Sequence, residues 1–222
     1  MKNKATISAD IVSSTALNVE DRLILEKKLL EILRDLKQFF GEKNFYGRLI
    51  KGDYIECVLE NPKQALRAAL ILKSFVKSLD IAQNDKGQAI NKFKEYGIRI
   101  AVGIGELAIF DTKKGIIDGE AIYFSGRAIN EMPKNSKYTL IFKSKNEKRD
   151  EEFTAIFKLL DFMFNKYKGA QSKVVFYKLL NKTDKEIALL LNKSASTVNQ
   201  HSTSTGWYAV NSAVQYFEKT IK

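Results

Sequence analysis

The pattern of hydrophobic and polar positions along the first two thirds of the chain predicts strands and helices in alternation. An amphipathic helix is expected over 18–40, where leucine and phenylalanine recur at three- and four-residue intervals. A second helix is expected to begin at Asn61-Pro62, an N-cap followed by a first-turn proline, and to run through Leu79. The other predicted elements are strands over 4–12, 45–50, 53–60, 97–105, 107–110 and 138–144, a polar surface excursion over 80–95 and a short helix over 119–132.

The order of these elements predicts an α+β fold for this part of the chain. Strand, helix, two strands, helix and strand in succession are typical of the ferredoxin-like plan, in which helices pack on one face of an antiparallel sheet. The strand over 107–110 is expected to pair with the strand over 97–105.

From Glu147 onward the strand patterns stop and only helical patterns follow. This switch predicts a boundary near residue 146, between an α+β domain over 1–146 and an all-α domain over 147–222. The expected helices cover 150–166, 170–180, 183–192, 195–203 and 207–221.

The helices over 183–192 and 195–203 have the parts of a helix-turn-helix module. Thr183 is expected to cap the first helix, and Glu186 to complete a capping box. Asn192-Lys193 supplies the turn, and Ser194 is expected to cap the second helix. The final helix carries an apolar stripe that is expected to cover this pair, formed by Trp207, Val210, Val214, Phe217 and Ile221.

The outward face of the second helix is expected to be polar, which suits contact with DNA bases and phosphates. The formal net charge is +11, and residues 166–200 contain seven lysines against Asp184 and Glu186, a charge distribution that favours a polyanionic partner. The alternative is a helical hairpin used for packing or dimerisation. The candidate DNA-binding residues are Lys193, Ser196, Thr197, Asn199, Gln200 and Thr203.

This segment resembles the helix-turn-helix of LuxR-type regulators and of region four of sigma factors. The matching residues are Glu186-Ile-Ala in the first helix, and Ser194, Thr197-Val198 and His201 around the second. The resemblance implies that double-stranded DNA is a partner. His201 is the only histidine of the chain, which argues against a histidine-based metal or catalytic site.

Two aspartates in the first part of the chain are candidate metal ligands. Asp10 ends the first predicted strand and precedes the polar run Ser13-Ser14-Thr15, while Asp53 follows Gly52 at a bend between two strands. Two carboxylates from neighbouring strands are suited to holding Mg²⁺ or Mn²⁺ for phosphoryl transfer.

In order along the chain, Asp10-Ile-Val-Ser-Ser-Thr, the Gly52-Asp53 bend, the strand over 98–106 and the segment over 119–129 resemble the catalytic domain of class III nucleotidyl cyclases. The resemblance implies that Asp10 and Asp53 bind metal and that Arg127 stabilises the transition state. It also implies a nucleotide ligand, with Asp118 as a candidate contact to the base.

Two departures from the cyclase pattern predict a degenerate site. The family has an asparagine four residues before the arginine, but this chain has Tyr123, which lacks the paired donor and acceptor of an amide. Loss of one transition-state donor typically costs about two to three orders of magnitude in rate. The segment between Arg48 and Asp53 is also shorter than in the family, so Lys51 is a poor match for the lysine that contacts the base.

A cyclase-like domain followed by a helix-turn-helix is similar to the arrangement in the SatD family of bacterial proteins. The sequence as a whole therefore predicts a DNA-binding transcriptional regulator with a degenerate cyclase-like domain for sensing or dimerisation. The alternative is an active class III-type cyclase, or another metal-dependent nucleotide-processing enzyme. A homodimer is expected, because cyclase-like sites form between two subunits and many helix-turn-helix proteins bind paired half-sites.

The composition favours a cytoplasmic protein without a membrane partner. No apolar run approaches the length of a membrane span, and the first residues lead directly into a strand pattern. The single cysteine, Cys57, excludes an internal disulfide and is interpreted as a packing residue of its strand.

Overall fold

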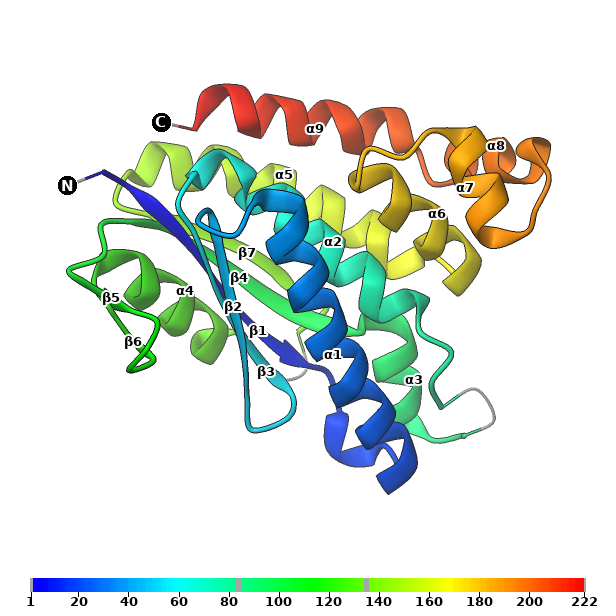
Figure 1. Cartoon of the computed structure of the whole chain (residues 1–222), viewed down its shortest axis with the longest axis horizontal. Coiled ribbons are helices and arrows are strands. Elements are labelled where there is room, and N and C mark those ends of the chain that lie inside the picture. Colours follow the sequence, from blue (N-terminus) through cyan, green and yellow to red (C-terminus); the bar gives the residue numbers. More distant parts are fainter. Residues whose placement is uncertain (1, 83–84, 134–135, 222) are drawn as a thin grey trace.

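A computed structural model describes residues 2–82, 85–133 and 136–221. Its centre is a five-stranded sheet in the order β2-β3-β1-β4-β7 (Figure 1). The first four strands are antiparallel, as predicted, whereas β7 pairs in parallel with β4. The sheet therefore follows the ferredoxin-like order and adds one parallel edge strand. The strands are β1 (Lys4–Ile11), β2 (Phe45–Ile50), β3 (Tyr54–Leu59), β4 (Ile98–Gly105) and β7 (Leu140–Ser144).

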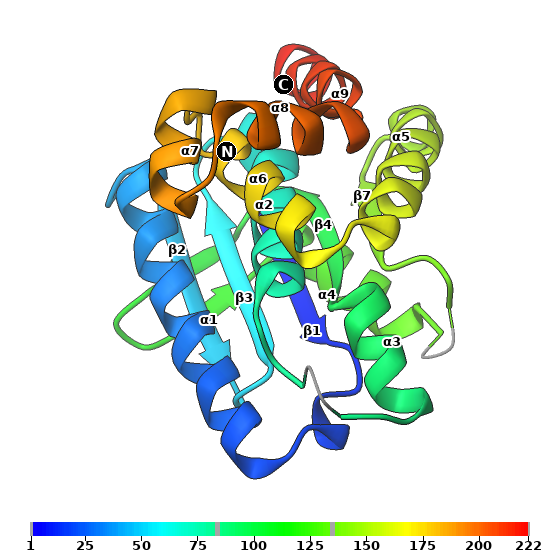
Figure 2. The same ribbon diagram turned by 90° about the vertical axis from the view of Figure 1, so that its right-hand side faces the viewer.

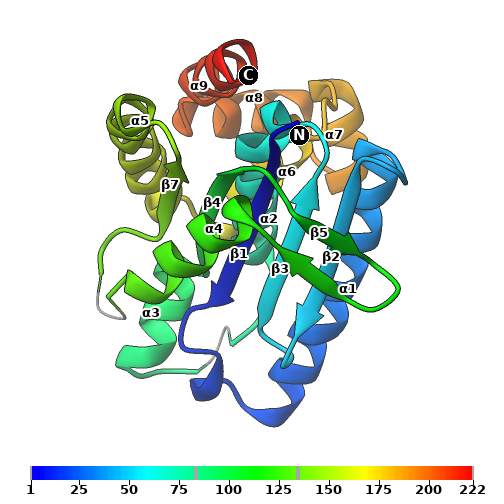
Figure 3. The ribbon, with the colours of Figure 1, turned by 90° about the vertical axis from the view of Figure 1, so that its left-hand side faces the viewer.

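Helices cover both faces of the sheet, so the prediction of helices on a single face was wrong. The helices α1 (Val19–Phe40) and α2 (Ala65–Ser78) pack on one face, and α4 (Glu120–Glu131) packs on the other (Figure 3). Side chains of β1 alternate between the faces. Thr6 and Ser8 bond to Ser125 of α4, while Ile7 lies in the apolar core beneath α2.

The connection between α2 and β4 contains a helix that the sequence pattern did not predict. The segment over 80–95 is expected to be a polar excursion, but α3 spans Gln88–Tyr96. Only Ile90 and Phe93 of this helix are buried, so its apolar face is too narrow to stand out in the sequence.

The strand predicted over 107–110 was assigned to the wrong partner. Strand β5 (Ile109–Asp111) pairs with β6 (Ile116–Asp118) in a separate two-stranded hairpin, and not with β4. This hairpin lies beside α4 on the same face of the main sheet, where Phe110 of β5 packs against Tyr46 of β2 (Figure 3).

After β7 the chain is entirely helical, as predicted. Among the described residues, no helix is long and apolar enough to cross a membrane. Short 3₁₀ helices, η1 (Ser14–Ala16) and η2 (Pro62–Gln64), lie before α1 and α2. The C-terminal helices are α5 (Glu147–Lys166), α6 (Gly169–Leu179), α7 (Asp184–Leu191), α8 (Ala195–Ser204) and α9 (Trp207–Thr220).

One apolar core continues across the boundary predicted near residue 146. It joins Ile7 and Leu29 of the α+β part to Phe157 of α5 and Phe217 of α9. A fully buried ion pair between Lys73 of α2 and Asp161 of α5, 3.0 Å apart, adds a polar link. The boundary is thus a change of secondary-structure type within a shared core, and the division into two domains stays a prediction.

Helix α9 does not cover the α7–α8 pair as expected. Its stripe residues Val210, Val214 and Phe217 belong to the main core, and Phe217 packs against Phe142 and Phe153. Helix α6 covers the inner side of the α7–α8 pair instead, through Val174.

Candidate nucleic-acid interface and carboxylate site

The caps of α7 and α8 fix the geometry of the candidate interface, and both predicted caps are confirmed. At the start of α7, Thr183 Oγ1 accepts from the backbone N–H of Glu186, and the Glu186 carboxylate accepts from the backbone N–H of Thr183 at 2.8 Å. These bonds lower the pKa of Glu186 to about 2. Ser194 Oγ accepts from the backbone N–H of Thr197 at 3.1 Å and begins α8.

The turn between the two helices is set by Asn192, which has a left-handed conformation with φ of 50°. Asparagine tolerates this conformation better than most residues. The backbone N–H of Lys193 then bonds to the carbonyl of Ala188 at 2.9 Å, closing the end of α7.

A small apolar cluster holds the helices together. Ile187 and Ala188 of α7, Val198 of α8 and Val174 of α6 are buried against one another. Val198 is therefore the residue by which α8 packs against α7 and α6. The exposed side chains of α7 include Leu189 and Leu190, which the sequence analysis did not single out.

The predicted DNA-contacting residues lie mainly on one exposed face of α8. Ser196, Asn199, Gln200 and Thr203 are exposed at helical spacings of three and four, and Lys193 is exposed in the turn beside them. Thr197 differs, because it is only partly exposed and its hydroxyl bonds to Ser194 at 2.9 Å. Thr197 thus belongs to the cap as much as to the face.

Much of the positive charge of this segment is balanced within the chain. Lys173 pairs with Asp80 at 2.8 Å, Lys178 with Asp184 at 2.7 Å and Lys182 with Glu186 at 3.2 Å. Lys185 and Lys193 make no ion pair with a described residue. Lys185 lies in the first turn of α7 and Lys193 in the turn between α7 and α8, so these two lysines are the charges best placed to meet phosphate.

The candidate metal ligands Asp10 and Asp53 lie at the same end of neighbouring strands. Asp10 stands opposite Tyr54 in the β1–β3 ladder. Tyr54 directly follows Asp53 in the chain. The carboxylate of Asp10, however, forms an ion pair with Arg99 of β4. Asp53 Oδ2 accepts from Ser14 Oγ at 2.6 Å.

A cleft of about 480 Å³ opens beside Asp53 and not beside Asp10. Lys51 and Glu26 contribute to its lining, together with the hydroxyl residues Ser14 and Thr15. Among the described residues there is no group of three or more histidine, cysteine, aspartate or glutamate side chains suited to a metal ion. Since Asp10 must leave Arg99 before it coordinates a cation, the present side-chain arrangement does not fit a two-metal site, and metal binding stays a prediction.

The candidate catalytic residue Arg127 lies on the exposed side of α4. Its guanidinium carbon is 5.7 Å from the centre of the Tyr123 ring. The Tyr123 hydroxyl donates to Asp118, and this bond raises the pKa of Tyr123. Asp118, the candidate base contact, is thereby held by Tyr123.

The glycines of β4 have a packing role that accounts for part of the cyclase-like pattern. A Cβ on Gly103 would lie 2.3 Å from the carbonyl oxygen of Ala121, and one on Gly105 would lie 2.8 Å from Cβ of Glu120. These glycines allow the backbone of α4 to approach the sheet closely.

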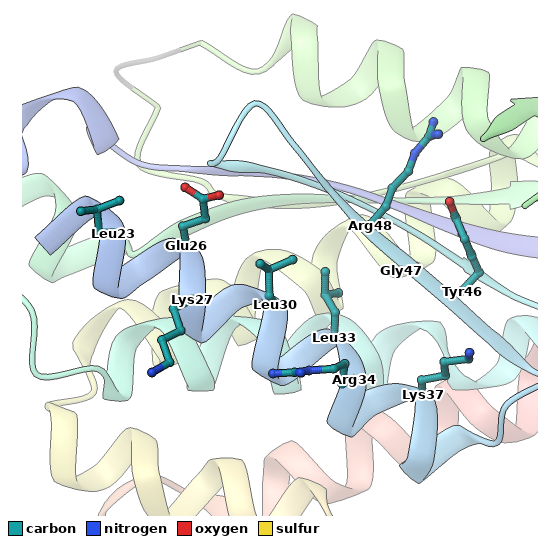
Figure 4. A pocket seen from close by; sticks show the side chains of 10 residues that line it. All are labelled: Leu23, Glu26, Lys27, Leu30, Leu33, Arg34, Lys37, Tyr46, Gly47 and Arg48. Atoms are coloured by element: carbon teal, nitrogen blue, oxygen red, sulfur yellow. The ribbon is translucent and has the colours of Figure 1, made fainter. Parts of the chain in front are cut away.

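A groove of about 640 Å³ runs between α1 and β2 and adjoins the Asp53 cleft (Figure 4). It is mainly apolar and includes the exposed side chains of Leu23 and Leu30. None of Asp10, Asp53 and Arg127 lines it. Its lining also contains the charged residues Glu26, Lys27, Arg34, Lys37 and Arg48.

Two solved structures of a bacterial light-regulated adenylyl cyclase are similar to this chain. One shares 18% sequence identity at a TM-score of 0.45 and covers 64% of this chain and 42% of that chain. The other shares 16% identity at a TM-score of 0.44 and covers 64% and 43%. This chain thus spans less than half the length of those cyclases. No family model matches the sequence, and no curated protein matches it.

Proposed function

We propose that this protein is a DNA-binding transcriptional regulator in which α8 reads the major groove. The observation that carries the proposal is the exposed polar face of α8, formed by Ser196, Asn199, Gln200 and Thr203, with Lys193 at its beginning. The α7–α8 pair lies at one end of the molecule, away from β5, β6 and α4 (Figure 1). The exposed face of α8 is therefore remote from the β5–β6 hairpin and from α4.

The chemistry of this face suits base recognition. The amide groups of Asn199 and Gln200 present a donor and an acceptor side by side, which matches the edge of adenine in the major groove. The hydroxyls of Ser196 and Thr203 suit bases or phosphates. Lys185 and Lys193 are suited to contact the phosphate backbone of the DNA, where their charge adds affinity but no sequence preference.

Substitution of the amide residues tests the assignment of α8. Asn199→Ala and Gln200→Ala should each weaken binding to a selected duplex by roughly 5- to 150-fold, the equivalent of about 1–3 kcal/mol for a bidentate base contact. Fluorescence anisotropy with the full chain measures this affinity. The duplex comes from repeated selection out of a random pool.

The matched control is Gln215→Ala, an exposed glutamine on α9 away from the proposed face. It should bind like the unchanged protein. Equal loss in Gln215→Ala and Gln200→Ala, or no loss in either amide variant of α8, excludes α8 as the reading helix.

The α+β part serves in this proposal as a sensing or dimerising unit derived from a cyclase-like fold. The second candidate function is nucleotide cyclisation, favoured by the placement of Asp10 and Asp53 at the ends of neighbouring strands. The Asp10–Arg99 ion pair and the presence of Tyr123 weigh against it. Cyclic nucleotide production with Mg²⁺ or Mn²⁺ that Asp10→Ala abolishes is the result that would favour this second candidate.

Homodimerisation is part of the proposal. A dimer presents two copies of α8 to paired half-sites, and the spacing of the half-sites then follows from the geometry of the protein. Light scattering at tens of micromolar should give about twice the mass of the 25.2 kDa chain. A monomer under these conditions contradicts the dimeric form of the proposal.

A further inference from the structure

A polar cleft of about 770 Å³ lies where α2, α3, α5 and α6 meet. It is separate from the Asp53 cleft and from the exposed face of α8. Its walls are the end of α2, the second half of α3 and the short connection between α5 and α6. The lining includes Lys77, Lys94, Asn165, Lys166, Lys168 and Gly169.

Asn165, one of the residues that line the cleft, has a buried hydrogen-bond acceptor without a partner among the described residues. Asn165 is 8% exposed, and its Oδ1 accepts no hydrogen bond from the residues that the structure describes. Its Nδ2 makes only a long contact of 3.5 Å to the carbonyl oxygen of Lys137. A buried polar atom left unsatisfied costs free energy, so this oxygen is suited to a donor group from a ligand.

The charge of the cleft favours an anion. Besides Lys77, whose Nζ is held by backbone carbonyls, three lysines line it against two acidic residues, Asp80 and Glu95, and Asp80 bonds to Lys173 at 2.8 Å. Lys77 Nζ donates to the backbone carbonyls of Glu95 and Asn165, which offsets the partial negative charge at the ends of α3 and α5. Lys166 and Lys168 make no ion pair with a described residue.

The first turn of α6 adds a second feature that anions prefer. Helix α6 begins at Gly169, so the positive end of its dipole faces the cleft. A Cβ placed on Gly169 would meet only the carbonyl oxygen of Lys77, at 3.9 Å. The backbone at this point is therefore open to close approach by a ligand.

The same connection is bonded to the end of α8. Tyr167, which lines the cleft, donates its hydroxyl to the carbonyl of Thr205. Gln171 Nε2 bonds to Ser204 Oγ at 2.9 Å. Because α6 also packs against α7 and α8, a displacement of the α5–α6 connection reaches the candidate DNA-binding helices.

We propose that this cleft binds a small phosphate-bearing molecule, with its phosphate at Lys166, Lys168 and the start of α6 and a donor group of its organic part on Asn165. Transmission of this binding to α8 through Tyr167 and Gln171 rests on the proposed function in DNA binding. The binding site itself does not.

Isothermal titration calorimetry of the full chain without DNA tests the site. The probes are glycerol 3-phosphate, which carries both phosphate and hydroxyl groups, and malate as a carboxylate. Glycerol 3-phosphate should bind, and the double variant Lys166→Gln/Lys168→Gln should weaken its binding at least tenfold. A double variant of two exposed lysines outside the cleft, Lys63→Gln/Lys219→Gln, carries the same charge change and should bind like the unchanged protein.

Two results overturn the site. One is no binding of glycerol 3-phosphate, or binding no tighter than that of malate. The other is an equal loss in the two double variants, because a general effect of net charge then accounts for the affinity.

Asn165→Ala separates the donor contact from simple charge attraction. Sulfate has no O–H group, so Asn165→Ala should leave sulfate binding unchanged while it weakens glycerol 3-phosphate binding by roughly 3- to 10-fold, the usual size for one hydrogen bond. Equal effects on the two anions contradict the role assigned to Asn165. Circular dichroism of each variant confirms that the fold is retained.

Addition of glycerol 3-phosphate to the anisotropy assay tests transmission. A shift in DNA affinity that Tyr167→Phe abolishes supports it, since this variant removes only the hydroxyl that bonds to Thr205. If calorimetry shows the site and DNA affinity does not respond, transmission is excluded and the site stands. If no DNA binding occurs at all, the proposed function fails independently of the cleft.

Discussion

Lys77 lies at the junction of three helices and has a lowered pKa. Its Nζ donates to the carbonyls at the ends of α3 and α5. Burial, followed by the neighbouring charge of Lys73, lowers the pKa of Lys77 from the ordinary 10.5 to about 7. Glu95 and Asp161 partly offset this shift, whereas Lys168 adds to it.

This pKa predicts a stability that rises with pH. Between pH 7 and about 10.5 the unfolded chain holds a proton on Lys77 that the folded chain has released, so raising the pH favours the folded state. Below pH 7 both states hold the proton, so the folded state carries the full free-energy cost of burying the charged form of Lys77. Relative to Lys77→Met, the unchanged protein should gain on the order of 2–3 kcal/mol of unfolding free energy between pH 6 and pH 9.5.

Urea unfolding of both proteins at the two pH values measures the difference. The comparison with Lys77→Met cancels the titration of groups that the two proteins share. A constant difference between them across this range contradicts the lowered pKa.

At the scale of the element, the cap of α7 decides where the candidate DNA-binding pair begins. Thr183 and Glu186 satisfy each other's backbone N–H groups, and the Thr183 hydroxyl also donates to the Glu186 carboxylate at 2.8 Å. The pKa of Glu186 therefore reports on the cap directly, since the bonds from Thr183 are the main cause of its low value.

Thr183→Ala should raise the pKa of Glu186 from about 2 toward its ordinary 4.5, because the side-chain bond is lost and the end of the helix loosens. The pH titration of the Glu186 side chain by NMR measures this change. Thr203→Ala, on the exposed face of α8, is the control and should leave the titration unchanged. An unaltered Glu186 pKa in Thr183→Ala shows that the cap does not form as described.

The elements that the sequence predicted correctly are those governed by local rules. Helix caps at Asn61, Thr183 and Ser194 depend on neighbouring residues, and they are confirmed. The helical spacing of α1 and α5 to α9 is equally local. Helix α3 was missed because only two of its side chains are buried.

At the scale of the whole molecule, the errors concern which elements meet. A strand pattern does not name its partner, so the pairing of β5 with β6 and the parallel edge strand β7 were not predicted. The apolar stripe of α9 has regular helical spacing, which predicts that the stripe is buried but not which element covers it. The packing of Phe217 in this stripe against Phe142 and Phe153 depends on the tertiary fold.

The candidate sites also differ in whether they are formed by residues close in sequence or by residues that meet only in the tertiary fold. The exposed face of α8 was predicted because its residues are close in sequence. The cleft at Lys77, Asn165 and Gly169 was not, since its residues come from separate segments that converge only in the folded chain. The Asp10–Arg99 pair was also missed, because it joins strands far apart in the sequence.

The central claim, that this protein binds DNA through α8, is tested most directly by the affinity of the full chain for a selected duplex at several salt concentrations. The account predicts binding that weakens linearly on a double logarithmic plot of affinity against salt, with a slope of about −0.9 for each phosphate contact. Gln200→Ala should lower affinity at every salt concentration without changing that slope, because it removes a base contact and no charge. The claim would be contradicted if selection recovers no preferred duplex and Gln200→Ala binds DNA with the same affinity as the unchanged protein.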